Sequence, residues 1–200
     1  TLFLPRKLDL VDYGYWQLYL FYISYSGFLI FGWNDGIYLR YGGRYYSEVK
    51  NSLFRSQFNY AIVSQLVFSS IIVILAFILS DEVLFFVFVG IAINTLLYNS
   101  RSILLFTLQA TNLMKEYALV SIVGRILYVL LLIISLITDR VQLSSIVLFD
   151  LFGKFFSFLL AVYFCRDIVF GKITGFKKSI KEAYLNITVG IKLMFANIAS

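Results

Sequence analysis

Three ionisable side chains lie deep within apolar runs of this sequence: Arg125, Asp150 and Lys154. Ionisable residues are costly in a hydrocarbon layer and by default mark functional positions. Asp150 and Lys154 are four residues apart, so a helix places them on one face. Arginine suits phosphate oxygens, which it grips with two parallel hydrogen bonds. With two cations against one anion, these residues predict a positive cavity that holds a phosphate or pyrophosphate group.

Two other roles stay open for the same residues. Asp150 could simply neutralise Lys154 or Arg125 and hold two helices in register. It could instead be the titrating group of a site coupled to ions or protons. A carboxylate beside two cations should stay ionised, which argues against easy protonation of Asp150.

Polar residues extend the cluster at helical spacing. Ser121 and Tyr128 share a helical stripe with Arg125. In an earlier apolar run, Asn94 shares a stripe with Arg101. Each such helix has one face that prefers protein or water, so the bundle is expected to surround a polar interior. The candidates for a substrate path are Arg125, Lys154, Asp150, Arg101 and Asn94.

Membrane-spanning helices must position these side chains. Of the 200 residues, 60% are hydrophobic and 14% are charged, whereas a soluble domain has about 45–50% and about 25%. Apolar runs long enough to cross ~30 Å of hydrocarbon recur along the chain. The sequence predicts an all-α, polytopic transmembrane bundle forming a single domain over residues 1–200. The spans are expected at about 13–33, 57–80, 83–108, 117–137 and 141–165, with the start of another at 183–200.

The fourth and fifth spans are expected to form a hairpin with a very short loop. Arg125 precedes Thr138 by 13 residues, and Lys154 follows Val141 by 13 residues. At 1.5 Å per residue, both side chains lie ~20 Å from the same membrane surface. The hairpin therefore predicts that Arg125 and Lys154 meet at one depth.

Loop charge predicts the orientation. The connections at 34–56 and 166–182 carry four and five Lys or Arg residues, and Arg101 near the end of the third span and Lys115 after it add two more on the same side. The opposite side offers three, which are Arg6, Lys7 and Arg140. Because cytoplasmic loops collect Lys and Arg, the basic loops 34–56 and 166–182 are expected in the cytoplasm.

Composition argues against an enzyme. Histidine is absent and Cys165 is the only cysteine, which excludes disulfides, Cys/His zinc sites and histidine-based catalysis. The eleven Asp and Glu residues are scattered without paired spacing. We expect no catalytic residue, no metal and no cofactor, and a membrane-bound glycosyltransferase or acyltransferase is disfavoured. Topology accounts for the net charge of +6, so membrane lipids rather than nucleic acid are the expected partners.

The chain is also expected to be a fragment. It starts at Thr1 and ends within the apolar run 183–200. A half-finished span would not be stable in lipid, so further helices are expected after it. The outside location of the first residues implies one helix before it.

The run DYGYWQLYLFYISYSGFLIFGWNDGIYLRYGG, from Asp12 to Gly43, carries a family resemblance. It resembles the O-antigen and capsular polysaccharide flippases of the multidrug/oligosaccharidyl-lipid/polysaccharide (MOP) exporter superfamily. The likeness rests on the tyrosine-glycine-x-tryptophan that enters a helix and on the two glycine-containing motifs that leave it. The resemblance puts a cytoplasmic structural turn, in which the acidic residue could pair with either arginine, at Asn34, Asp35, Arg40 and Arg44.

The resemblance implies a fold and a function. The fold is the N-terminal lobe of a MATE-like transporter, in which two six-helix lobes face a central cavity and work by alternating access. The function is to move undecaprenyl-pyrophosphate-linked oligosaccharide across the bacterial inner membrane for O-antigen or capsule biosynthesis. The implied partners are this substrate, membrane lipids and other polysaccharide assembly proteins. Family members have a cationic lumen, which Arg125 and Lys154 fit by character.

Two alternatives remain. A multidrug/cation antiporter of the same superfamily would prefer an acidic cavity, and one intramembrane Asp against two cations points away from it. A non-transporting membrane scaffold or sensor would pack its spans around a dry core. A water-filled polar cavity would therefore separate transport from scaffolding.

Overall fold

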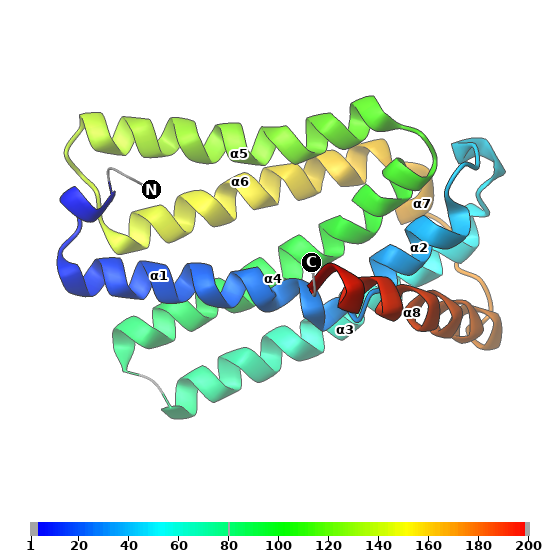
Figure 1. Cartoon of the computed structure of the whole chain (residues 1–200), viewed down its shortest axis with the longest axis horizontal. Helices are drawn as coiled ribbons and strands as arrows, with labels where there is room; N and C mark the ends of the chain where they lie inside the picture. Colours follow the sequence, from blue (N-terminus) through cyan, green and yellow to red (C-terminus); the bar gives the residue numbers. More distant parts are fainter. Residues whose placement is uncertain (1–3, 80, 199–200) are drawn as a thin grey trace.

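The structure, a computed structural model, describes residues 4–79 and 81–198. Over these ranges the chain forms eight α-helices and no strand, arranged as an elongated bundle (Figure 1). The helices are α1 (Leu10–Tyr25), α2 (Trp33–Tyr41), α3 (Asn51–Leu79), α4 (Glu82–Ala110), α5 (Met114–Ile137), α6 (Leu143–Phe164), α7 (Arg166–Val169) and α8 (Phe176–Ile198). The ends of two expected spans, at 80 and 199–200, lie outside the described residues. The expectation of an all-α fold is confirmed for the rest.

Four helices are long and apolar enough to cross a membrane within the described ranges: α3, α4, α5 and α6. They coincide with the second to fifth expected spans, so the chain is a multi-pass membrane protein. Their outer surfaces are apolar, as the 57% exposed Ile74 and the 57% exposed Ile134 illustrate. Such surfaces suit hydrocarbon rather than water.

The first expected span, 13–33, is interrupted. α1 ends at Tyr25, and a 3₁₀ turn follows over Ser26–Ile30. Phe31 and Gly32 then adopt left-handed φ angles of 53° and 68° before α2 begins. The apolar run therefore builds a discontinuous helix, because its two residues with left-handed backbone cannot continue the first one.

Neighbouring helices satisfy the main-chain carbonyls that this break frees. The side-chain amide of Asn99 donates to the carbonyl of Ser26 at 2.9 Å. The side-chain amide of Gln65 donates to the carbonyl of Leu29 at 3.0 Å. Non-helical backbone is tolerated at membrane depth where protein groups pair with it. Buried amides on α3 and α4 thus allow the first span to bend.

The two expected basic loops are shorter than the sequence suggested. α2 occupies the start of the expected loop 34–56 and α3 its end, which leaves 42–50 as the connection. A turn at Gly42–Gly43 is confirmed, with φ of 82° at Gly43. The expected loop 166–182 contains α7 and the first turns of α8. The boundary of the expected loop 166–182 was wrong because Lys and Glu, although polar, are good helix formers. That of the loop 34–56 was wrong because α2 packs against α4 and α8.

α4 is the central helix, in contact with α1, α2, α3, α5 and α6. Its ends join two separate apolar clusters, one containing Val87 and Ile91 and the other containing Ile103 and Leu108. Between them, residues 94–102 include six polar side chains. The core is therefore apolar at both ends of the bundle and polar in the middle.

The connections gather by charge at the two ends of the bundle (Figure 1). The links from α2 to α3, from α4 to α5 and from α6 to α8 lie at one end. Residues 4–9 and the α5–α6 loop lie at the other, where Lys7 pairs with Asp139 at 2.7 Å. This arrangement agrees with the alternation of basic and non-basic connections expected from the sequence.

Candidate functional site

Two glycines set the distance between α5 and α6. A Cβ atom added at Gly124 would lie 2.8 Å from the carbonyl oxygen of Gly153, and one added at Gly153 would overlap the carbonyl oxygen of Gly124. Only glycine permits backbones to approach so closely. Since each glycine directly precedes a cation, the crossing brings Arg125 and Lys154 to one level of the hairpin.

A pocket of about 370 Å³ opens beside this crossing, between α4, α5 and α6. Three cations and one carboxylate line it, which gives the pocket a net charge of +2 when all four are ionised (3 − 1). The polar and charged side chains of its lining include Arg101, Arg125, Asp150, Lys154, Tyr98, Tyr117, Ser121 and Tyr128. Four of the five residues expected on the substrate path are therefore together in one pocket.

Asp150 is the only acidic residue in the described lining of this pocket, and it is already paired. Its Oδ2 accepts a hydrogen bond from the Lys154 ammonium at 2.7 Å and another from the Tyr19 hydroxyl at 2.5 Å. The Lys154 ammonium also lies 6.0 Å from the centre of the Tyr19 ring. The ion pair expected between Asp150 and Lys154 is thus present. The hydrogen bond from Tyr19 connects this pair to α1.

Arg101 reaches the pocket from α4 and is anchored on α6. Its Nη1 donates to the hydroxyl of Ser157 at 2.8 Å, and its guanidinium carbon lies 5.4 Å from the centre of the Tyr98 ring. The buried Nε of Arg101 has no hydrogen-bond partner among the described residues. Nη2 has no hydrogen bond to the described residues and is not buried, so the guanidinium retains one donor group for a ligand.

Arg125 differs from the other cations of the pocket because it is exposed. No carboxylate lies within ion-pair distance of its side chain in the described part of the chain. Of the three cations, Arg125 is therefore the one with most freedom to meet an incoming anion.

Asn94 does not join the other candidates in this pocket. It is buried, at 1% exposure, and lines a second pocket with Ser24 and Gly27 of the first span. Tyr98 and Lys154 line both pockets, so the two spaces are adjacent. Asn94 therefore remains beside the cationic pocket, on the side of α1.

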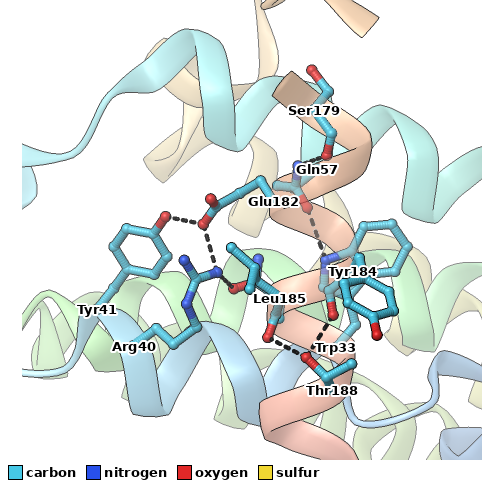
Figure 2. Close-up of polar contacts among 10 residues, drawn as sticks. Trp33, Arg40, Tyr41, Gln57, Ser179, Glu182, Tyr184, Leu185 and Thr188 are labelled. Carbon is cyan, nitrogen blue, oxygen red and sulfur yellow. Dashed lines mark hydrogen bonds and ion pairs between the residues drawn. The ribbon is translucent and has the colours of Figure 1, made fainter. Parts of the chain in front are cut away.

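The family-motif residues are not a cytoplasmic turn, contrary to expectation. Asn34, Asp35 and Arg40 lie within α2, and only Arg44 follows it. Arg40 pairs with Glu182 of α8 at 2.6 Å, rather than with Asp35 (Figure 2). The structure gives Asp35 no ion pair within the described residues, and burial raises its pKa. The expected pairing was local, whereas the observed one joins residues 142 positions apart.

The remaining motif residues help to hold α2 in place. The side-chain amide of Asn34 donates to the hydroxyl of Ser102 on α4 at 2.7 Å. The guanidinium of Arg44 lies 5.1 Å from the centre of the Tyr41 ring. The Tyr41 hydroxyl donates to Glu182, and burial followed by this hydrogen bond raises the pKa of Tyr41. These contacts give the motif a structural role in α2.

Sequence reasoning missed Tyr19, which donates to Asp150 of the pocket, and Tyr117, which lines the pocket. Tyr19 belongs to the tyrosine-rich run 13–25, and aromatic residues in such a run suit the membrane interface or helix packing rather than a site. Its spacing of three from Trp16 marked a helical stripe, and both residues are buried. Tyr117 could not be predicted as a pocket residue because the lining depends on tertiary packing, whereas Tyr98 shares the helical stripe of Asn94 and Arg101.

With three cations and one paired carboxylate, the pocket has the charge and the hydrogen-bond donors to accommodate an anion. No group of three or more His, Cys, Asp or Glu residues within the described ranges could hold a metal ion. Comparison of the chain with protein-family models, with curated proteins and with solved structures gives no match.

Proposed function

We propose that this chain is part of a bacterial inner-membrane flippase that moves undecaprenyl-pyrophosphate-linked oligosaccharide for O-antigen or capsule biosynthesis. In this proposal the chain is the N-terminal lobe of a MATE-like fold of the MOP superfamily. The main support is the cationic pocket, which is lined by Arg101, Arg125 and Lys154. Its single carboxylate, Asp150, is already paired with Lys154. A pyrophosphate is the part of the substrate that such a pocket would hold.

The depth of the pocket supports transport. Arg125 is 11 residues from the start of α5 and 12 from its end, which corresponds to ~17–18 Å on either side. Cations held near the middle of a span can offset the cost of taking a phosphate out of water. The anionic headgroup would enter the pocket while the polyprenyl tail stays in lipid, and movement of the lobes would expose it outside.

The lining of the pocket weighs against the alternatives. A cation antiporter of the same superfamily would need carboxylates free to bind its substrate, and Asp150 is engaged by Lys154 and Tyr19. A membrane scaffold would have no need of a polar pocket within the span region. The proposal includes other polysaccharide assembly proteins as partners, because these proteins handle the same substrate.

Replacement of Arg125 or Lys154 by Gln in the full-length protein tests this function. Arg125→Gln removes an exposed cation with no ion pair within the described chain, so the fold should be unaffected. We expect each variant to lower surface polysaccharide several-fold at an unchanged protein level, measured by gel analysis and immunoblot of the same cells. Lys115→Gln, at the exposed start of α5, is the matched control and should behave as wild type. Unchanged polysaccharide in both pocket variants would remove these cations from the mechanism.

A further inference from the structure

Polar and close-packed contacts fix the rotation of α8 about its axis. Ser179, Glu182, Asn186 and Gly190 form one helical stripe that faces the bundle, and three of them are buried. Gln57 of α3 donates to the carbonyl of Ser179 at 3.0 Å (Figure 2). This stripe leaves the opposite side of α8 without a partner in the described residues.

Contacts with α2 hold the same stripe of α8. Arg40 donates to Glu182 at 2.6 Å (Figure 2). It also donates to Asn186 at 2.5 Å. A Cβ atom at Gly190 would overlap the carbonyl oxygen of Gly32, so α2 and α8 cross in backbone contact. α8 cannot turn without breaking these contacts.

The outward side of α8 is strongly basic. Lys177 and Lys181 lie opposite the buried stripe, since successive residues are rotated by about 100° in a helix. Lys178 flanks them, and all three side chains are exposed. Lys172 and Arg166, in the segment before α8, are also exposed.

Carboxylates do little to neutralise this charge. Glu182 is turned towards α2, where Arg40 and Tyr41 donate to it. Asp167 is the one exposed carboxylate between residues 166 and 181. Five cations therefore stand against one accessible anion.

Large apolar side chains adjoin the lysines. Phe176, Ile180 and Tyr184 are spaced by four residues and form an exposed stripe next to Lys177 and Lys181, with exposed fractions of 67%, 46% and 66%. Before α8, Phe170 and Ile173 are 66% and 59% exposed. Lysine beside aromatic and aliphatic residues is the pattern of a helix lying at the level of lipid headgroups.

We infer that the outward face of residues 166–184 binds the anionic phospholipid headgroups of the cytoplasmic leaflet. The lysines meet the phosphates, and the Phe176–Ile180–Tyr184 stripe enters the acyl region. Charge complementarity selects a lipid surface, because an acidic protein would leave this apolar stripe exposed to water. The position of the segment beside the span ends at the basic end of the bundle puts it at the height of headgroups (Figure 1). This inference does not depend on the proposed transport.

Native mass spectrometry of the purified whole chain tests the inference. The chain is titrated with phosphatidylglycerol or with phosphatidylcholine, and bound lipids are counted. The variant Lys177→Gln/Lys178→Gln/Lys181→Gln should bind phosphatidylglycerol much more weakly, on the order of fivefold for each lysine. Binding of phosphatidylcholine should not change. High salt should weaken phosphatidylglycerol binding to the wild type, because these charges are exposed.

A second triple variant controls for net charge. Lys50→Gln/Lys115→Gln/Arg140→Gln removes three exposed cations elsewhere and should retain phosphatidylglycerol binding. Equal loss in both variants would mean that total charge, not this face, attracts the lipid. Unchanged phosphatidylglycerol binding in the first variant would mean that the lysines either bind another acidic partner or serve only to set the membrane topology. Either result overturns the inference, provided that circular dichroism shows both variants folded.

Discussion

At the scale of residues, Asp150 is the link between the pocket and the first span. One of its oxygens receives both the Lys154 ammonium and the Tyr19 hydroxyl, at 2.7 Å and 2.5 Å. The side chains of Lys154 and Asp150 are only 20% and 17% exposed. An ion pair so shielded from water is costly to break from one side, because the other charge is left without a partner.

The pair should therefore show strong coupling. We expect Asp150→Asn to lower the free energy of unfolding by roughly 2 kcal/mol, because it leaves Lys154 without its counter-ion. Lys154→Gln should cost less, since Tyr19 still donates to Asp150. The double variant should lose less than the sum of the two single losses. Thermal unfolding of the purified chain in detergent measures all three, and simple additivity would contradict the pairing.

Tyr41 offers a second test at this scale, with a defined dependence on pH. Tyr41→Phe removes one of the donors to Glu182 and should cost about 1–2 kcal/mol. Burial and Glu182 raise the pKa of Tyr41, so its stabilising contribution is fully present below the unfolded-state value of about 10 and is lost as pH rises through the folded-state pKa. The loss measured by thermal unfolding should thus be equal at pH 7 and pH 9.

The control for this variant is Tyr184→Phe. The Tyr184 hydroxyl has no hydrogen bond within the described chain, and the residue is 66% exposed. This change should leave stability unaltered. A larger loss for Tyr41→Phe at pH 9 than at pH 7 would contradict the expected equality, because it would mean that the folded-state pKa of Tyr41 lies below its ordinary value.

At the scale of elements, glycines allow the backbones of particular helix pairs to touch. Gly32 and Gly36 let α2 approach α8 at Asn186 and Gly190 so closely that an added Cβ would overlap main-chain atoms. Small residues spaced by four are the common means of close helix packing in membranes. The same spacing on both helices, 32/36 and 186/190, explains why α8 packs on α2.

Gly36→Ala should therefore separate α2 from α8. The added methyl group would collide with the backbone of Asn186, which cannot swing aside, and overpacking of this kind costs about 1–3 kcal/mol. Gly14→Ala is the matched control, because nothing lies within 4 Å of its added Cβ. In the middle of α1, that change should stabilise the chain by roughly 0.5–1 kcal/mol. Opposite shifts in the unfolding temperature are expected, and shifts of one sign would contradict the crossing.

The elements differ in how far the sequence could predict them. Apolar runs bounded by Asp81 or Arg140 located α4, α5 and α6 to within a few residues, because hydrocarbon thickness sets span length. The equal distances of Arg125 and Lys154 from the hairpin loop were enough to predict that the two residues lie at the same level. The break at Phe31–Gly32 could not be predicted, because it depends on amides of distant helices. The same holds for the pairing of Arg40 with a residue 142 positions away.

At the scale of the whole molecule, the two ends of the bundle differ in charge and the middle of its core is polar. Two apolar clusters flank the polar residues of α4, and the cationic pocket lies at that level. The basic connections gather at one end, opposite the Lys7–Asp139 pair. This layout gives a single expected orientation, with the basic end in the cytoplasm.

Labelling of single cysteines tests that orientation with an internal control. Cys165 is fully buried, and burial followed by the neighbouring Asp167 raises the pKa of its thiol to about 12, so the wild-type chain should not react with maleimide near pH 7. Ser47→Cys lies in the exposed 42–50 connection at the basic end, and Ser144→Cys lies exposed at the opposite end. A membrane-impermeant maleimide should label Ser144→Cys in intact spheroplasts. It should label Ser47→Cys only after permeabilisation. The reverse labelling pattern would mean that the bundle has the opposite orientation. Residues 166–184 would then not lie at the cytoplasmic leaflet, where their lysines are expected to bind anionic lipid.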